Sequence, residues 1–324
     1  MPRVLFLLLL LGTSVGMTRS EPIQQARNES TTRVVAMQVP LDPEGGHRRV
    51  GALVYVSGYV LESADPRFGG ISAMARTPQG FVALSDSGTV MWINAARGRP
   101  TSVRLLPLPA GPGTGAKKSD RDSEALVRDE RGRIWVAYEH HNSIWRYGPD
   151  LHHAEANRAP ADMRRWPANS GPEAMVRLDD GRFIVFSEDV RRDGTSDVLL
   201  FDRDPTDPRS RAERLSYRLP RGFSVTDAAL LGAGRIVTLH RSASISDGLV
   251  ASVGIADLGA IRAGAVVAPR IVSTLHPPLT VDNMEALAVE RVGGRTRLWI
   301  ASDDNFSALQ RTLLLQFQLD ERAR

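Results

Sequence analysis

Acidic residues recur at matching places in this sequence, and their chemistry suits binding a metal ion or moving protons. One series stands near the start of short alanine-containing segments, at Glu124, Glu173, Asp227 and Glu285. A second series follows the next apolar segment of each unit, at Asp86, Glu139, Glu188, His240 and Asp303, with Asp189 and Asp304 beside two of them. Carboxylate oxygens are the preferred ligands of hard cations such as Ca²⁺, which takes about six to eight oxygens.

The spacing of two pairs brings like charges together. Glu124 and Glu139 are fifteen residues apart, as are Glu173 and Glu188. We expect two-residue turns at Arg131-Gly132 and Asp180-Gly181, since glycine tolerates the positive φ of tight hairpins. The two carboxylates of each pair would then lie directly opposite on neighbouring strands, roughly 5 Å apart, which destabilises a sheet. A bound cation, a nearby arginine or a raised pKa would compensate.

From this pattern we predict Ca²⁺ at the rim where the two series meet. The candidate metal ligands are Glu124, Glu188, Glu285, Asp86, Asp303 and Asp304. The catalytic candidates are Glu173, Glu139 and His240. Either glutamate would act as general base, and His240, with Arg121 and Arg241, would neutralise developing charge. An acidic residue at a strand end is also typical of simple hydrogen bonding to a neighbouring turn, and that alternative stays open.

Basic residues near these positions could bind an anionic substrate. They are Lys117, Lys118, Arg121 and Arg241. Residues 117–121 could equally form a solvated loop after the glycine-rich stretch that precedes them. His140 and His141 are adjacent and would point to opposite faces of a strand, so a zinc site that uses both is not expected.

The elements that must position these side chains form a repeat. Its anchoring alanines are Ala73, Ala125, Ala174, Ala229 and Ala286, separated by 52, 49, 55 and 57 residues. Each is followed by a glycine turn and by two apolar segments rich in β-branched and aromatic residues, with a weaker outer segment in some units. A period of about fifty residues indicates an all-β propeller with four-stranded antiparallel blades. Five units favour five blades; a sixth blade involving Val34 to Val39 is the alternative.

The ends of the repeat indicate how the ring closes. The last unit ends at Phe317 without room for a fourth strand, whereas the strand-like segment Leu53 to Leu61 precedes the first unit. We predict that this N-terminal strand completes the C-terminal blade.

The N-terminal sequence and the composition indicate where the protein is located and which kinds of site it lacks. Arg3, the apolar run Val4 to Leu11 and the small residues of 12–20 indicate a signal peptide; the run is too short for a membrane span, which needs roughly 20 residues. We therefore expect a signal peptide at 1–20, a lead-in segment at 21–49 and one propeller domain at 50–324. The product would be a periplasmic or secreted monomer without a permanent membrane anchor. The absence of cysteine excludes disulfides and thiolate sites, and no nucleic-acid signature is present.

Several motifs together resemble a known family. "FGGISAM" with "FVALSDSG", "RDSEAL" with "WVAYE", "GPEAM" with "FIVFSED", and "NMEALAV" with "LWIASDDNF" look like the phytase-like domain named for esterase-like activity of phytase, over about residues 67–319. This domain occurs in exported bacterial proteins, and the resemblance implies a propeller related in architecture to the calcium-dependent β-propeller phytases, with phosphoester or ester hydrolysis as the activity. By position it transfers Glu124, Glu173, Glu285, Asp86, Asp303 and Asp304 as candidate ligands. Lys117 and Lys118 are the only lysines, so arginines would have to hold a highly charged phosphate.

The function expected from these observations is metal-assisted hydrolysis of a phosphoester or carboxylic ester, with a small anionic or ester substrate. Two alternatives stay open: a non-catalytic binding or scaffold propeller, and a lactonase-like propeller enzyme.

Overall fold

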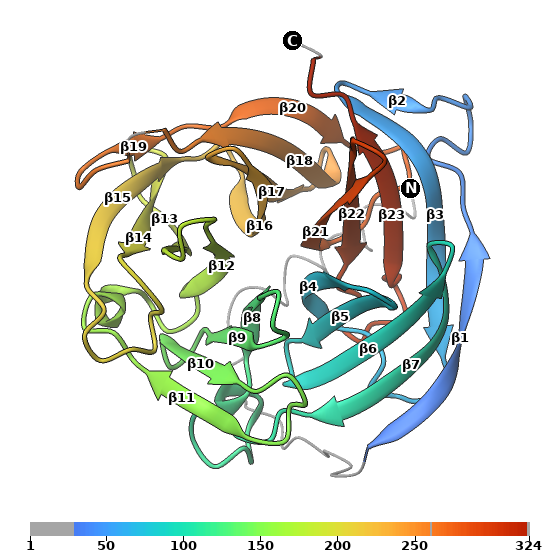
Figure 1. Ribbon diagram of the computed structural model, residues 1–324. Coiled ribbons are helices and arrows are strands. Elements are labelled where there is room, and N and C mark those ends of the chain that lie inside the picture. Colours follow the sequence, from blue (N-terminus) through green and yellow to red (C-terminus); the bar gives the residue numbers. More distant parts are fainter. Residues whose placement is uncertain (1–28, 260, 323–324) are drawn as a thin grey trace.

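The computed structural model describes residues 29–259 and 261–322, so the expected signal peptide lies outside the described residues. β-strands dominate these residues, and the helical segments are two single turns, η1 (Lys118–Asp120) and η2 (Met163–Arg165). Figure 1 shows the sheets arranged in a ring, with one edge strand of each toward the middle. This confirms an all-β architecture of mainly antiparallel sheets.

The sheets follow one another along the chain. The first holds β4 (Ile71–Thr77), β5 (Gly80–Ser85), β6 (Thr89–Ala96) and β7 (Arg99–Pro107). The second holds β8 (Ser123–Arg128), β9 (Ile134–Tyr138), β10 (Ser143–Tyr147) and β11 (Ala154–Arg158). The third holds β12 (Pro172–Arg177), β13 (Phe183–Val190), β14 (Thr195–Phe201) and β15 (Ala212–Arg218), with β19 (Val266–Val267) added in parallel.

The fourth sheet holds β16 (Ser224–Gly232), β17 (Arg235–Ser244), β18 (Gly248–Asp257) and β20 (Arg270–Leu275). The last repeat contributes β21 (Met284–Val292), β22 (Arg295–Ser302) and β23 (Leu313–Leu319). β3 (Leu53–Ser63) is antiparallel to β23, and the short β2 (Arg49–Val50) pairs with β3. β1 (Ser30–Gln38), within the expected lead-in segment, pairs with β7 through its first half and with β3 through its second.

The hydrophobic core lies between neighbouring sheets. One cluster joins Val82 and Leu84 of the first sheet to Val136 and Tyr138 of the second, and other clusters repeat this arrangement around the ring. Because both faces of each sheet are covered, inner strands such as Ile134–Tyr138 are buried along their whole length. The innermost strands β4, β8, β12, β16 and β21 contact one another in a closed cycle. Their ends are therefore brought close to a common axis.

The hairpins between first and second strands correct the expected register. The second and third units have three-residue loops, because Arg128 pairs with Ile134 and Arg177 pairs with Phe183, with one further hydrogen-bonded pair before each loop. Gly132 takes a φ of 85° at the end of its loop, which is typical of three-residue hairpins with a left-handed last residue. The two-residue turns predicted at 131–132 and 180–181 are therefore wrong.

A β-bulge recurs on the first strand of every unit. The register shifts by one residue between Ile71 and Ala73, Ser123 and Ala125, Pro172 and Ala174, Val225 and Asp227, and Met284 and Ala286. A bulge leaves one residue without a cross-strand partner and changes the direction of its side chain. The bulged residues are Ser72, Glu124, Glu173, Thr226 and Glu285.

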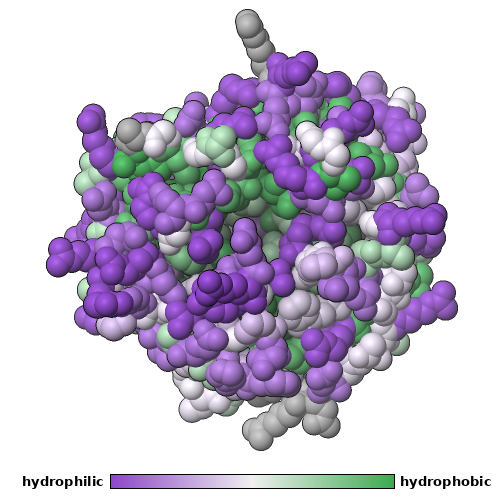
Figure 2. Space-filling model, viewed as in Figure 1, coloured by the Kyte–Doolittle hydropathy of each residue, from purple (hydrophilic) through white to green (hydrophobic). Residues whose placement is uncertain are grey.

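The surface is mixed in character. Figure 2 shows a face covered largely by hydrophilic residues, with apolar residues visible toward its hollowed middle. Within residues 29–259 and 261–322, no helix has the length and apolarity to cross a membrane.

Candidate functional site

The innermost strands surround a central channel, seen as the hollowed middle of the face in Figure 2. Two rings of equivalent positions meet at one rim of this channel. The first ring is the series of bulged residues. The second ring consists of the residues that end or follow the second strands: Asp86, Glu139, Glu188, Arg241 and Asp303. The backbone N–H of each of the four acidic members donates a hydrogen bond to the carbonyl directly before the first strand of its own unit. Glu139, for example, donates to the carbonyl of Asp122 at 2.9 Å. We call these ten positions, together with Asp122, the acidic rim.

Three glutamates of the acidic rim form the tightest group. Glu139, Glu173 and Glu188 each offer a carboxylate oxygen within 4.8 Å of the others. Glu139 and Glu173 are buried and Glu188 is half-buried. The bulge at Glu173 brings this side chain from the third unit toward Glu139 of the second unit. Three converging carboxylates with little solvent are a donor set that fits a hard cation.

The repulsion expected within this group is visible in the pKa values. Burial, with Asp122 and Glu188 nearby, raises the pKa of Glu139 to about 8. Burial, with Glu188 and Glu139 nearby, raises the pKa of Glu173 well above its ordinary value. Burial raises the pKa of Glu188 as well, partly opposed by Arg241. Without a cation, these side chains therefore hold protons at pH values where exposed glutamates are ionised.

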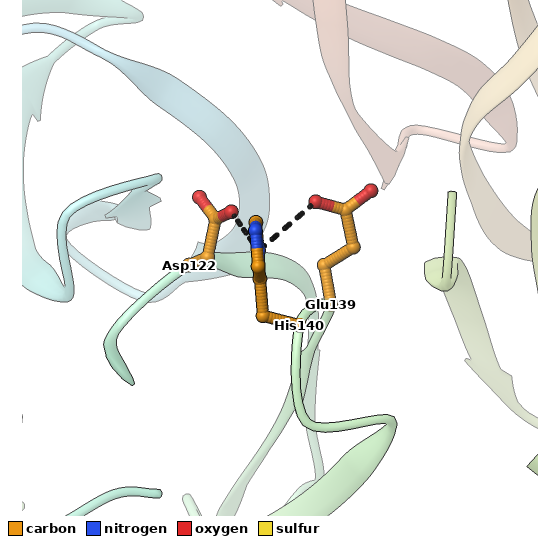
Figure 3. A group of neighbouring side chains, drawn as sticks. All are labelled: Asp122, Glu139 and His140. Carbon is orange, nitrogen blue, oxygen red and sulfur yellow. Dashed lines mark ion pairs between the residues drawn. The ribbon is translucent and has the colours of Figure 1, made fainter. Parts of the chain in front are cut away.

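Glu139 also belongs to a second group, drawn in Figure 3. Asp122 accepts a hydrogen bond from Nδ1 of His140 at 2.7 Å, and Glu139 Oε2 lies 3.6 Å from the same nitrogen. These three residues also offer ligand atoms within 4.8 Å of one another. The hydrogen bond to Asp122 raises the pKa of His140. The arrangement fixes the imidazole with Nδ1 as donor, which leaves Nε2 as the acceptor in the neutral ring.

Two cations offset part of the negative charge. Lys118 Nζ lies 2.6 Å from Asp86 and 3.6 Å from Asp122. The guanidinium of Arg241 lies 3.1 Å from Glu285 and 3.6 Å from Glu188, and it donates to Oδ1 of Asn283 at 2.7 Å. The compensation expected for opposed carboxylates thus includes a nearby arginine. Arg241 and Lys118 lie among the carboxylates, as counter-ions.

The remaining expected ligands divide between the acidic rim and the scaffold. Glu124 is at its bulge near Glu139 and Glu173, and burial raises its pKa well above the ordinary value. Burial and Glu285 likewise raise the pKa of Asp303. Asp304 instead accepts hydrogen bonds from the backbone N–H of Gly70 and Phe306 and from the Thr312 hydroxyl. Its oxygens connect the first and last units, so Asp304 is not a member of the acidic rim.

His240 is the main correction. It pairs with Val225, one position before the acidic rim, and Arg241 occupies the rim position instead. The imidazole is fully buried and stacks on the Tyr217 ring. Its Nε2 is hydrogen-bonded to the Tyr217 hydroxyl at 2.8 Å, and its Nδ1 to the Ser252 carbonyl. Burial lowers the pKa of His240 to about 4. It is a neutral core histidine, and the catalytic assignment fails because the side chain has no access to the channel mouth.

The fourth unit contains a second correction. Asp227 pairs across the hairpin with Leu239, as Ala125 pairs with Ala137, so Asp227 and not Ala229 is the counterpart of the anchoring alanines. Its buried carboxylate accepts the N–H groups of Leu287 and Ala228 at 2.7 Å each. Asp227 therefore connects two units, and Thr226 takes the bulged position.

The four basic residues expected to bind an anionic substrate lie in different surroundings. Arg121 donates to the carbonyls of Pro112 and Asp120 and so holds its own loop together. Lys117 is exposed. Of the expected anion-binding residues, Lys118 and Arg241 lie at the acidic rim.

Sequence reasoning missed Asp122 and Asn283. Both stand two residues before a bulged glutamate, in "DSE" and "NME". This shared polar position was the available signal. Asn283 donates its amide to Glu285 Oε1 at 2.8 Å and accepts from Arg241, so it orients both.

A family model described as esterase-like activity of phytase matches residues 66–306, more than half of the chain. The chain belongs to this phytase-like family. The family motifs surround the acidic rim, since "RDSEAL" contains Asp122 and Glu124 and "GPEAM" contains Glu173. A comparison with curated proteins finds no match to the sequence.

Several solved structures are similar to this phytase-like chain. Glutaminyl cyclase from Myxococcus xanthus is 10% identical with a TM-score of 0.50, and the match covers 83% of this chain and 96% of that one. A protein provisionally named as a gluconolactonase is 13% identical with a TM-score of 0.47, covering 88% and 92%. Virginiamycin B lyase from Staphylococcus aureus is 7% identical with a TM-score of 0.43, covering 88% and 99%. At these identities the likeness concerns the fold alone.

Proposed function

We propose that this phytase-like protein is a metal-assisted hydrolase of phosphoesters or carboxylic esters, with Ca²⁺ as the metal. The observation that carries the proposal is the convergence of Glu139, Glu173 and Glu188 within 4.8 Å at the channel rim. Buried like charges are costly unless protonated or paired with a cation, and Arg241 is near only part of the group. A bound cation would offset the repulsion between these carboxylates without any change in the fold.

The donor set indicates which residues would hold the ion. Glu139, Glu173 and Glu188 are the ligands, and Glu124 is the nearest further carboxylate. When bound, Ca²⁺ would supply a positive charge that polarises the phosphoryl or carbonyl oxygen of the substrate. The sequence assignment of Glu139 and Glu173 to catalysis thus becomes an assignment to metal binding.

The neighbouring pair Asp122 and His140 provides proton transfer. Asp122 accepts the Nδ1 proton and holds the ring, so Nε2 can take the proton of a water that attacks the ester. The alcohol leaving group takes the proton back from the same nitrogen. Arg241 and Lys118 add positive charge beside the reacting group and favour the anionic transition state.

We further infer a ring of five blades in which β3 completes the last one. The pairing of β3 with β23 and the closed cycle of five inner strands support this reading. We also retain the proposal that the protein is exported to the periplasm or secreted as a monomer, on the basis of the N-terminal sequence.

Hydrolysis assays on chelator-treated protein test the proposed function. The substrates are 4-nitrophenyl phosphate and 4-nitrophenyl acetate, with CaCl₂ added back. We expect Ca²⁺ to restore turnover of one of them and Glu173→Gln to lower kcat/KM by about a hundredfold or more. The matched control is Glu213→Gln, on the exposed side of β15, which should keep full activity. Absence of turnover together with no calorimetric heat for Ca²⁺ would favour a scaffold propeller instead.

A further inference from the structure

A cleft beside the acidic rim is lined by arginines that the proposed chemistry does not use. It has a volume of about 600 Å³ and lies between the β13–β14 turn and the β15–β16 connection. Arg192, Arg218 and Arg221 line it, and Asp193 is the one acidic lining residue. The lining therefore carries net positive charge next to a rim that is rich in carboxyl groups.

The contacts of these residues leave two arginines available. Arg218 donates to the backbone carbonyl of Asp193 at 3.1 Å, and the Asp193 carboxylate accepts from the N–H and hydroxyl of Thr195. Arg192 and Arg221 are exposed and have no ion pair with any residue in the described part of the chain. A charged group with several unused donors in a cleft suits a carboxylate or phosphate.

The cleft also has apolar walls. Val190, Leu219, Pro220 and Phe223 line it beside the arginines. Val190 is 46% exposed and is part of the lining. Apolar walls with a few convergent polar groups are typical of small-molecule sites.

Two residues that line the cleft are neighbours of acidic-rim residues on the strands. Val190 lies two residues after Glu188 on β13, a separation of about 7 Å along a strand. Ser224, at the opposite end of the lining, is the cross-strand partner of Arg241. A molecule that reaches from the glutamates into the cleft thus needs an apolar body of about 7 Å, roughly the length of an aromatic ring with its substituents.

We infer that this cleft is the substrate subsite for an apolar group that ends in a carboxylate or phosphate. The substrate class is an ester whose scissile bond lies over Glu139, Glu173 and Glu188 and whose far end is anionic. The identity of the ligand as a substrate rests on the proposed hydrolase, whereas binding in the cleft needs neither turnover nor a metal.

Calorimetric titration of phenylphosphonate into chelator-treated protein tests the subsite. Without Ca²⁺ no metal ion at the rim can bind the phosphonate, and the arginine variants assign the heat of binding to the cleft. We expect binding that weakens about tenfold or more in Arg192→Gln/Arg221→Gln, since each charge-assisted hydrogen bond contributes appreciably. The matched control is Arg33→Gln, an exposed arginine on the outer strand β1, which should bind like the original protein. Benzyl alcohol should not bind, and inorganic phosphate should bind more weakly than phenylphosphonate.

Several outcomes would overturn the subsite. They are no phenylphosphonate binding, equal affinity in the double variant, or an equal loss in Arg33→Gln. Inorganic phosphate that binds as tightly as phenylphosphonate would remove the role of the apolar walls. Thermal midpoints of each variant exclude unfolding as the cause. If phenylphosphonate binds as expected but no ester is hydrolysed with Ca²⁺, the proposed reaction fails and the subsite stands.

Discussion

Replacement of Glu139 by glutamine should change how the stability of the metal-free protein depends on pH. In the original protein the pKa of Glu139 is raised from 4.5 to about 8 by burial and by Asp122 and Glu188. Between these pH values the folded state binds a proton that the unfolded state has released. The free energy of unfolding must therefore fall as the pH rises through this window.

The pKa difference sets the magnitude. Each pKa unit corresponds to about 1.36 kcal/mol, so the interval from 4.5 to about 8 amounts to at most about 5 kcal/mol for Glu139. The raised pKa values of Glu124, Glu173 and Glu188 act in the same direction. His140 does too, because its pKa is raised and the stabilisation by its charged form is lost as the pH rises through that value. The ionised Glu139 also raises the pKa of its neighbours, so removing it should reduce the whole effect.

Urea unfolding in a chelator at pH 5 and pH 8 measures this effect. We expect the original protein to lose several kcal/mol between the two pH values. Glu139→Gln should lose less and should be the more stable protein at pH 8. Ca²⁺ at pH 8 should stabilise the original protein and have a smaller effect on the variant. Glu213→Gln, which removes an exposed glutamate, should behave like the original protein. A metal-free protein equally stable at pH 5 and pH 8 would refute the reasoning.

Two further substitutions test the scaffold by urea unfolding. Asp227→Ala leaves the buried N–H groups of Leu287 and Ala228 without their acceptor and should lower the free energy of unfolding by about 2 to 4 kcal/mol; a loss below about 1 kcal/mol would contradict the proposed connection between units. Gly70→Ala places a Cβ 2.4 Å from the Phe306 ring at a φ of 61° and should cost about 1 to 3 kcal/mol, more than Gly46→Ala, where the φ is similar but the space is open; equal costs would show that the Phe306 contact is unimportant.

The fold was predictable because its signals are local and repeated. Alternating turns and apolar segments at a fifty-residue period follow from blades that bury both faces, and strands such as Ile134–Tyr138 were placed correctly. The outer strand β11 (Ala154–Arg158) was missed. Its residues are polar or small because it lies at the outer edge of its sheet, where only Ala154 packs against the core.

The register of the site was not predictable to one residue. The inference that Glu139 lies opposite Glu124 assumed a two-residue turn and an unbroken ladder. The three-residue loop shifts the pairing by one position and the bulge shifts it by another, so the N–H of Glu139 bonds to the carbonyl of Asp122. Neither shift leaves a strong composition signal, since glycine suits both loop lengths and a bulge accepts many residues.

The same displacement explains how the acidic rim can exist. The bulge leaves Glu173 without a cross-strand partner on the ladder, and its carboxylate lies within 4.8 Å of both Glu188 of its own unit and Glu139 of the adjacent unit. The repulsion is thereby gathered at the channel mouth, where a cation can reach it.

The fourth unit differs from the others at the acidic rim, and this makes the site asymmetric. Its bulged residue is Thr226, and Arg241 stands where the other units carry carboxylates, so the second ring has a guanidinium at this position, beside Glu188 and Glu285. The arginine-lined cleft borders the same unit through Ser224. An ester with an anionic far end would be attracted toward the cleft at that end and held over Glu139 and Glu173 at the other. The departure of one unit from the repeat is thus what would orient a substrate on an otherwise near-symmetric ring.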